Sequence, residues 1–189
     1  MNKTLKSILI GVAFLLLISV LFIGTYNKMV SLDQKVKRAQ SDIDTQLQRR
    51  NDLIPNLVNT VKGYAAQEKD IFIEIANARA KIGGAKTVGE KANADNELST
   101  ALSRLLVVVE RYPDLKSSAN FRDLTVALEG TENRINIARQ DYNRTVDTYN
   151  ATIKKFPNFI IAGIFRFEDK EYYKAAEGVK EVPKVEFSR

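Results

Sequence analysis

Apolar and polar residues follow a helical pattern along most of this chain. From Met29 onward, apolar residues recur at steps of three and four, which places them on one face of a helix. The pattern predicts helices at about residues 26–65, 67–82, 88–111 and 117–156. Amphipathic helices joined by short connections bury their apolar faces against one another. We therefore expect an all-α chain with an antiparallel four-helix bundle at residues 26–157 and coiled-coil-like packing.

An uncharged apolar run precedes the bundle. Ile8 to Ile23 carries no charge, and with Gly24 to Tyr26 it approaches the ~20 residues that span hydrocarbon. A cleaved signal peptide is the competing interpretation, but the run ends without the small-residue site that cleavage requires. Residues 1–25 are therefore predicted to be a single-pass transmembrane helix that contacts the lipid bilayer through Ile8–Gly24. With no strong helix breaker after it, this helix is expected to continue into the bundle.

The charges around this run do not settle its orientation. Lys3 and Lys6 precede it, and Lys28, Lys35 and Lys37 follow it, so the positive-inside rule favours neither side clearly. We interpret the chain as a cell-membrane protein whose bundle lies on the extracytoplasmic side.

Residues 158–189 combine a short apolar segment with a charged tail. Phe159 to Phe165 is too short to span a bilayer. The antiparallel arrangement brings it back toward the membrane surface, where an apolar helix can lie in the interface. Whether it contacts the membrane stays open, and the tail from Glu168 is expected to be extended.

Composition excludes several kinds of chemistry. The 189 residues contain no cysteine and no histidine, which excludes thiol nucleophiles, disulfides, thiolate zinc sites and imidazole catalysis. A di-metal bundle site would also need Glu-x-x-His pairs. The net charge of +6 is diffuse and partly due to the lysines before the apolar run, so no nucleic-acid partner is predicted. We predict no catalytic residue, no cofactor and no metal site.

The stretch Arg49–Tyr64, RRNDLIPNLVNTVKGY, places polar residues and a proline inside an apolar helical repeat. Pro55 should bend or restart the helix. Antiparallel pairing sets this stretch level with Gly130, so that Arg49 or Arg50 faces Glu132. The same register predicts that Asn51 or Asp52 faces Asn133 or Arg134.

These residues are predicted to form a polar lock between the two long helices, or a surface for a partner. Arginine pairs on helices more often form interhelical salt bridges or a solvated face than anion sites. Tyr142 and Tyr149 are more typical of core aromatics than of a stacking platform. The candidate residues are Arg49, Arg50, Asn51, Asp52, Pro55, Asn56, Thr131, Glu132, Asn133, Arg134, Tyr142 and Asn143.

Several motifs, in order, resemble the LemA family. They are the Arg49–Tyr64 stretch, Arg111-Tyr112-Pro113-Asp114-Leu115-Lys116, Glu129-Gly130-Thr131-Glu132-Asn133-Arg134-Ile135 and Ala138-Arg139-Gln140-Asp141-Tyr142-Asn143. The resemblance covers Tyr26 to about Phe167 and leaves the tail unaligned. It implies a bacterial-type membrane protein with one N-terminal helix and a helical bundle, from a family without an established enzymatic activity.

Our interpretation is a non-enzymatic scaffold or protein-interaction module at the bacterial membrane. Its protein partner is not identified by the sequence, and a homo-oligomer stays open. The alternatives are a histidine- and cysteine-independent enzyme, or a lipid- or anion-binding protein that uses the Arg49–Asn56 surface.

Overall fold

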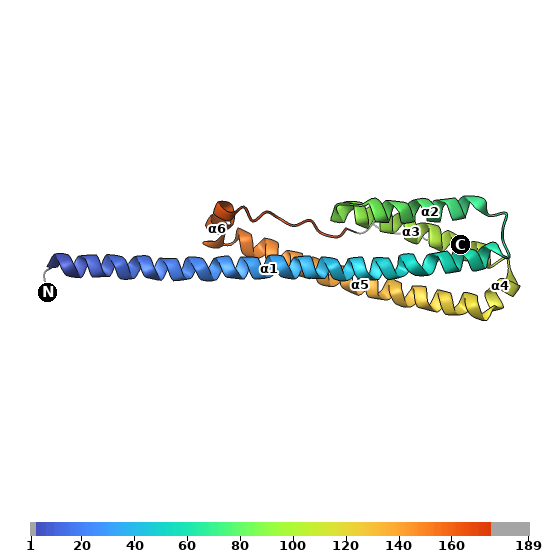
Figure 1. Cartoon of the computed structure of the whole chain (residues 1–189), viewed down its shortest axis with the longest axis horizontal. Helices are drawn as coiled ribbons and strands as arrows, with labels where there is room; N and C mark the ends of the chain where they lie inside the picture. The colour runs from blue at the N-terminus through green and yellow to red at the C-terminus, as the bar shows by residue number, and fades with distance from the viewer. Residues whose placement is uncertain (1–2, 175–189) are drawn as a thin grey trace, which may run out of the picture. The chain divides into compact units, whose positions relative to one another are not determined.

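The computed structural model describes residues 3–174, and these are helical for most of their length (Figure 1). No strand occurs in this range, which confirms the all-α prediction. The helices are α1 (Lys3–Lys62), α2 (Lys69–Gly84), α3 (Val88–Val109), α4 (Pro113–Ser117), α5 (Ala119–Lys154) and α6 (Asn158–Phe165).

Helix α1 continues from the apolar run into the bundle, as its lack of breakers predicts. It also passes Pro55 and ends only at Lys62, so the alternative that the helix restarts at this proline is wrong. Proline cannot donate to the carbonyl of Asn51, four residues earlier, yet the helix continues past it, with Ile54 and Leu57 buried in the core. Among the residues that the structure describes, no helix has both the length and the apolar character that a membrane crossing requires.

The described chain divides into two compact units. The first unit contains residues 3–41 and 141–170, and the second contains residues 42–140 and 171–174. Both long helices, α1 and α5, contribute to each unit.

The second unit surrounds one apolar core. Its buried side chains come from α1, α2, α3 and the beginning of α5, with Leu115 from the short helix α4. Burial of each large apolar side chain contributes about 1.5–3 kcal/mol. The core residues are Ile54, Leu57, Val61, Ala65, Ile71, Phe72, Ile75, Ala78, Leu98, Ala101, Leu105, Val108, Val109, Leu115 and Phe121.

Helices α2 and α3 of this unit pack antiparallel. Lys81 pairs with Glu97 at 2.6 Å, and Arg104 pairs with Glu74 at 2.7 Å. Both pairs are solvent-exposed, so each contributes little to stability, but together they mark one register along the two helices. A capping box between Thr87 and Glu90 starts α3.

The first unit holds α6 and the residues that follow it. The ring of Phe165, at the end of α6, lies 4.7 Å from the ring of Tyr26 on α1. Asn150 then fixes the backbone of Lys170, donating to its carbonyl at 2.9 Å and accepting from its amide at 2.8 Å. The Lys170 side chain pairs with Asp33 at 2.9 Å. The start of the tail is therefore held by specific contacts, although it forms no helix or strand.

Candidate functional site

A fully buried carboxylate lies at the centre of the second unit's polar residues. Asp95, on α3, is 0% exposed. It occupies a core position of this helix, one turn before Leu98, where the apolar pattern calls for an aliphatic residue. A buried charge is strongly unfavourable unless charged or hydrogen-bonding groups surround it. The neighbours of Asp95 are therefore the first candidates for function.

Arg50 reaches Asp95 from α1. It lies in the apolar stripe of that helix and is only 2% exposed. One terminal nitrogen, Nη2, forms an ion pair with the carboxylate of Asp95. The other, Nη1, donates to Oγ of Ser99 at 3.1 Å and to Oε2 of Glu132 at 2.5 Å. One guanidinium thus joins α1 to α3 and α5 within this unit.

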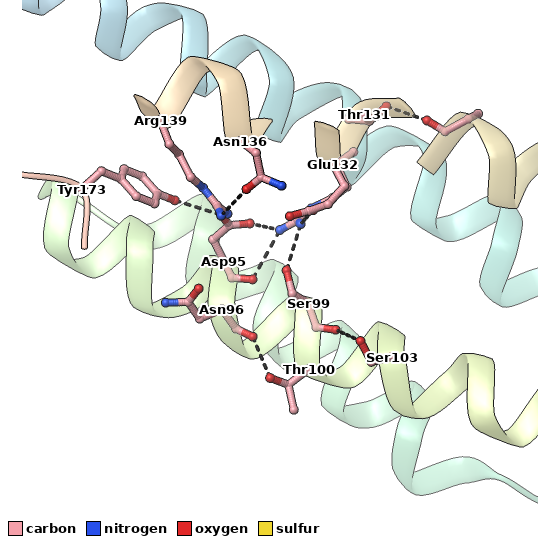
Figure 2. A network of polar contacts seen from close by, with 12 residues as sticks. Asp95, Asn96, Ser99, Thr100, Ser103, Thr131, Glu132, Asn136, Arg139 and Tyr173 are labelled. Carbon is pink, nitrogen blue, oxygen red and sulfur yellow. Dashed lines mark hydrogen bonds and ion pairs between the residues drawn. The ribbon is translucent and has the colours of Figure 1, made fainter. Parts of the chain in front are cut away.

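Arg139 and Tyr173 complete the surroundings of Asp95. Arg139, on α5, forms an ion pair with Oδ2 of Asp95, and the hydroxyl of Tyr173 donates to the same oxygen at 2.9 Å. The guanidinium of Arg139 also lies 5.1 Å from the centre of the Tyr173 ring, a cation–π distance. Figure 2 shows these side chains converging from α3, α5 and the segment after α6. We call Arg50, Asp95, Ser99, Glu132, Arg139 and Tyr173 the Asp95 cluster.

The charges of the Asp95 cluster balance, with two guanidinium groups facing two carboxylates. Burial raises the pKa of Glu132, because it penalises the charged carboxylate. Burial also raises the pKa of the Tyr173 phenol, an effect that the nearby Arg139 partly opposes. The phenol is therefore a neutral donor at physiological pH. Asp95 is fully buried and contacts two arginines and a tyrosine, so its carboxylate is not accessible to a substrate, whereas the Glu132 side chain is 38% exposed.

The structure brings together only some of the residues that the sequence singled out. Of the two arginines predicted to face Glu132, Arg50 forms the ion pair and Arg49 does not. Thr131 is fully buried beside it and donates to the carbonyl of Ala127 at 2.8 Å. The exposed side chains are those of Arg49, Asp52, Asn56, Asn133 and Arg134, while Pro55 is half-buried.

The pairing expected for Asn51 and Asp52 is wrong. Asn51 accepts a hydrogen bond at 2.7 Å from Arg79 of α2, instead of facing Asn133 or Arg134 on α5. Asp52 points along its own helix and accepts from Gln48 at 2.8 Å. Successive residues of a helix point about 100° apart, so Arg50 and the adjacent Asn51 face different neighbours.

Two candidate residues, Tyr142 and Asn143, belong to the first unit. Tyr142 is buried, with 2% of its surface exposed, and Tyr149 is buried on the same helix, as expected for core aromatics. Asn143 is half-buried.

Sequence reasoning did not select Asp95, Arg139 or Tyr173. The position of Asp95 in the apolar repeat of α3 was an available signal, because a lone acid at a core position requires a cation. Arg139 belongs to a recognised motif, but its helical position does not identify its partner. Tyr173 lies in the charged tail, where no periodicity relates it to α3.

The match to known families covers all of these residues. The LemA family model matches residues 39–187, a range that includes Arg50, Asp95, Arg139 and Tyr173. The chain belongs to the LemA family. The match extends through the tail, beyond the limit near Phe167 that the motifs indicated.

Curated relatives of this LemA-family chain include magnetosome proteins. Magnetosome proteins MamQ 1 and MamQ 2 of Paramagnetospirillum magneticum are each 31% identical to it, over 84% of this chain and 71% of theirs. Magnetosome protein MamQ of Magnetospirillum gryphiswaldense is 31% identical over 78% of this chain and 64% of its own. Protein LemA of Metamycoplasma hominis is 22% identical over 71% of this chain and 62% of its own.

Proposed function

We propose that this LemA-family chain is a single-pass cell-membrane protein without catalytic activity, whose bundle presents a surface to a protein partner. The anchor is the N-terminal part of α1, and the bundle lies on the extracytoplasmic side. The observation that carries the proposal is the exposure of large apolar side chains along α1 before Tyr26.

These side chains point in every direction around the helix. Phe14, Leu15 and Leu16 are 62%, 64% and 62% exposed, although consecutive residues point about 100° apart. A helix that packs on one face against a protein core has an apolar stripe, whereas a helix that is apolar all round suits lipid. Exposure to water would cost about 25 cal/mol for each Å² of apolar surface. The exposed apolar residues are Leu9, Ile10, Val12, Phe14, Leu15, Leu16, Val20 and Ile23.

An interaction role suits the bundle better than catalysis does, because its buried charges are paired with one another. The charges of Arg50 and Arg139 are balanced by those of Asp95 and Glu132 inside the second unit. The exposed part of the Arg49–Asn56 stretch borders a shallow cleft of about 530 Å³. Amide and hydroxyl groups of the kind that hydrogen-bond to a protein surface line this cleft. Its lining residues are Asn56, Asn59, Thr60, Asn120, Asp123 and Leu124.

Alkaline extraction of membranes tests the anchor. The full chain should stay in the membrane pellet, and Leu15→Lys combined with Leu16→Lys should move it to the soluble fraction, because central lysines cost several kcal/mol in lipid. The matched control is Val126→Lys with Ile137→Lys, which changes two apolar residues that are 67% and 52% exposed on α5. Release of the unaltered chain by alkali would overturn the anchor.

Crosslinking tests the interaction role. Because the chain contains no cysteine, Asn59→Cys places a unique thiol in the cleft, and Val107→Cys places one on an exposed position of α3. In intact membranes, the thiol at position 59 should give one reproducible protein adduct that the thiol at position 107 does not give. Recovery of monomer alone at position 59, with crosslinkers of several lengths, would count against the proposal.

Labelling tests the orientation. A thiol introduced by Lys86→Cys, in the exposed turn before α3, should react with an impermeant maleimide added to intact cells. A thiol introduced by Asn2→Cys should react only after the membrane is permeabilised. The opposite result would place the bundle on the cytoplasmic side.

A further inference from the structure

We propose that α6 is an interfacial helix, whose exposed apolar face enters the surface of the bilayer where α1 emerges. This inference rests on the proposed membrane anchor and adds a second lipid contact in the first unit. Lipid, rather than a protein, covers the exposed face of α6.

Helix α6 has two apolar faces but packs only one of them. Ile161 and Ala162 are buried, with 3% and 5% of their surfaces exposed. The remaining large side chains face outward, with Ile164 61% exposed and Phe159 54% exposed. A helix of eight residues that leaves this much apolar surface in water requires a covering partner. The outward-facing residues are Phe159, Ile160, Ile164 and Phe165.

An aromatic residue just before α6 enlarges this surface. Phe156 is 81% exposed, and its ring centre lies 6.4 Å from that of Phe159. Phenylalanine is common on the apolar face of helices that lie in the membrane interface.

The position of α6 along α1 identifies lipid as the partner. The rings of Phe165 and Phe167 lie 4.7 and 5.9 Å from the ring of Tyr26. Tyr26 follows the uncharged segment Ile8–Gly24 by two residues, which is about 3 Å along a helix. The end of α6 is therefore level with the point where the proposed anchor leaves the hydrocarbon.

Basic residues flank the apolar face at the same level. Lys155 precedes α6, Arg166 follows it and Lys28 follows Tyr26 on α1, and all three are exposed. Lys154 also lies there, although Asp169 pairs with it at 2.5 Å. Basic groups beside an apolar face favour anionic headgroups. At about 1.5 Å per residue, α6 is far too short to cross the bilayer, so it is expected to lie along the surface.

Depth-dependent quenching tests this arrangement in the full chain. Ile164→Cys carries a polarity-sensitive fluorophore, and the protein is reconstituted into phosphatidylcholine–phosphatidylglycerol vesicles that contain spin-labelled lipid. Two further single-cysteine variants serve as references: Leu15→Cys within the anchor, and Val107→Cys on α3, which is 71% exposed in the second unit. Circular dichroism establishes that each variant retains its helix content.

The fluorophore at position 164 should be quenched more by lipid labelled near the headgroup than by lipid labelled deep in the acyl chain. The position 15 fluorophore should show the reverse order, and the position 107 fluorophore should lose none. Quenching at 15 without quenching at 164 would overturn the interfacial helix and leave the anchor standing. A position 164 fluorophore shielded from aqueous iodide but unquenched by lipid would assign the face to a protein and also overturn the inference. Quenching at 164 without quenching at 15 would support lipid contact by α6 and overturn the anchor.

Discussion

The hydroxyl of Tyr173 donates a hydrogen bond to the buried carboxylate of Asp95 at 2.9 Å, although 78 positions separate the two residues. The bond joins the segment after α6 to the middle of α3 within the second unit. Asp95 also pairs with Arg50 and Arg139, so one carboxylate ties together α1, α3, α5 and the tail. The buried polar groups of this unit therefore depend on one another, which leads to two predictions about stability.

Removing the charge of Asp95 should destabilise the second unit strongly. Asp95→Asn leaves the guanidinium groups of Arg50 and Arg139 close together with only Glu132 to balance them. Loss of one partner from a buried ion pair typically costs about 3–5 kcal/mol. Urea unfolding of the full chain in detergent, followed by circular dichroism, measures the change.

Glu97→Gln is the matched control for Asp95→Asn, because Glu97 is on the same helix but pairs with Lys81 on the surface. Loss of the Glu97–Lys81 pair should lower the free energy of unfolding by no more than about 1 kcal/mol. Equal effects of the two substitutions would contradict a structural role for the Asp95 cluster.

Tyr173→Phe should remove the hydrogen bond to Asp95 and leave the ring beside Arg139. A hydrogen bond to a charged group contributes about 1.5–3 kcal/mol, so a loss of that size is expected in the free energy of unfolding. The comparison is Tyr64→Phe, whose side chain is 48% exposed and should change stability by no more than about 0.5 kcal/mol. If Tyr173→Phe is as mild as the comparison, the hydrogen bond to Asp95 does not contribute to stability.

The spacing of apolar residues was sufficient to predict the helices and one contact between them. Steps of three and four located the long helices, and antiparallel pairing placed Arg49 or Arg50 opposite Glu132, of which Arg50 forms the ion pair. The same reasoning failed for Asn51, because register fixes the level of a side chain but not its direction around the helix. It missed Asp95 and Tyr173 for another reason: a contact between a core position and an aperiodic tail depends on the folded path of the chain.

Gly130→Ala should stabilise the protein. Helix α5 continues through Gly130, as its unbroken register predicted, and an added Cβ would meet only the Arg134 guanidinium at 3.8 Å. Alanine in a helix interior is favoured over glycine by about 1 kcal/mol. A higher urea midpoint at an unchanged slope is the expected result, whereas a lower midpoint would show that the site needs the smaller residue.

Asn150→Ala should release the start of the tail in the first unit. The Asn150 amide makes two hydrogen bonds to the backbone of Lys170, and both disappear in the variant. Hydrogen exchange of the Lys170 amide should accelerate, because the exchanging proton loses its acceptor. Asn133→Ala, an exposed change on α5, should leave that amide unchanged. Unaltered exchange in Asn150→Ala would mean that other contacts hold the segment.

The phenol of Tyr149 should make stability fall at alkaline pH. Its pKa rises from the ordinary value of 10.0 to about 12, mainly because of burial and also because of the negative charges of Asp33 and Asp169. The folded chain retains this proton over a range where the unfolded chain loses it. Stability from this group is therefore complete below pH 10 and declines as the pH rises toward 12.

The phenolate absorbance of the folded chain, compared with that of Tyr149→Phe, isolates this titration as a difference with a midpoint near 12. Asp33→Asn should lower the midpoint, because it removes a negative charge that disfavours the phenolate. Asp123→Asn, an exposed change in the second unit, should leave it in place. A Tyr149 midpoint close to 10 would show that the phenol is accessible to water and that the first unit is open at this position.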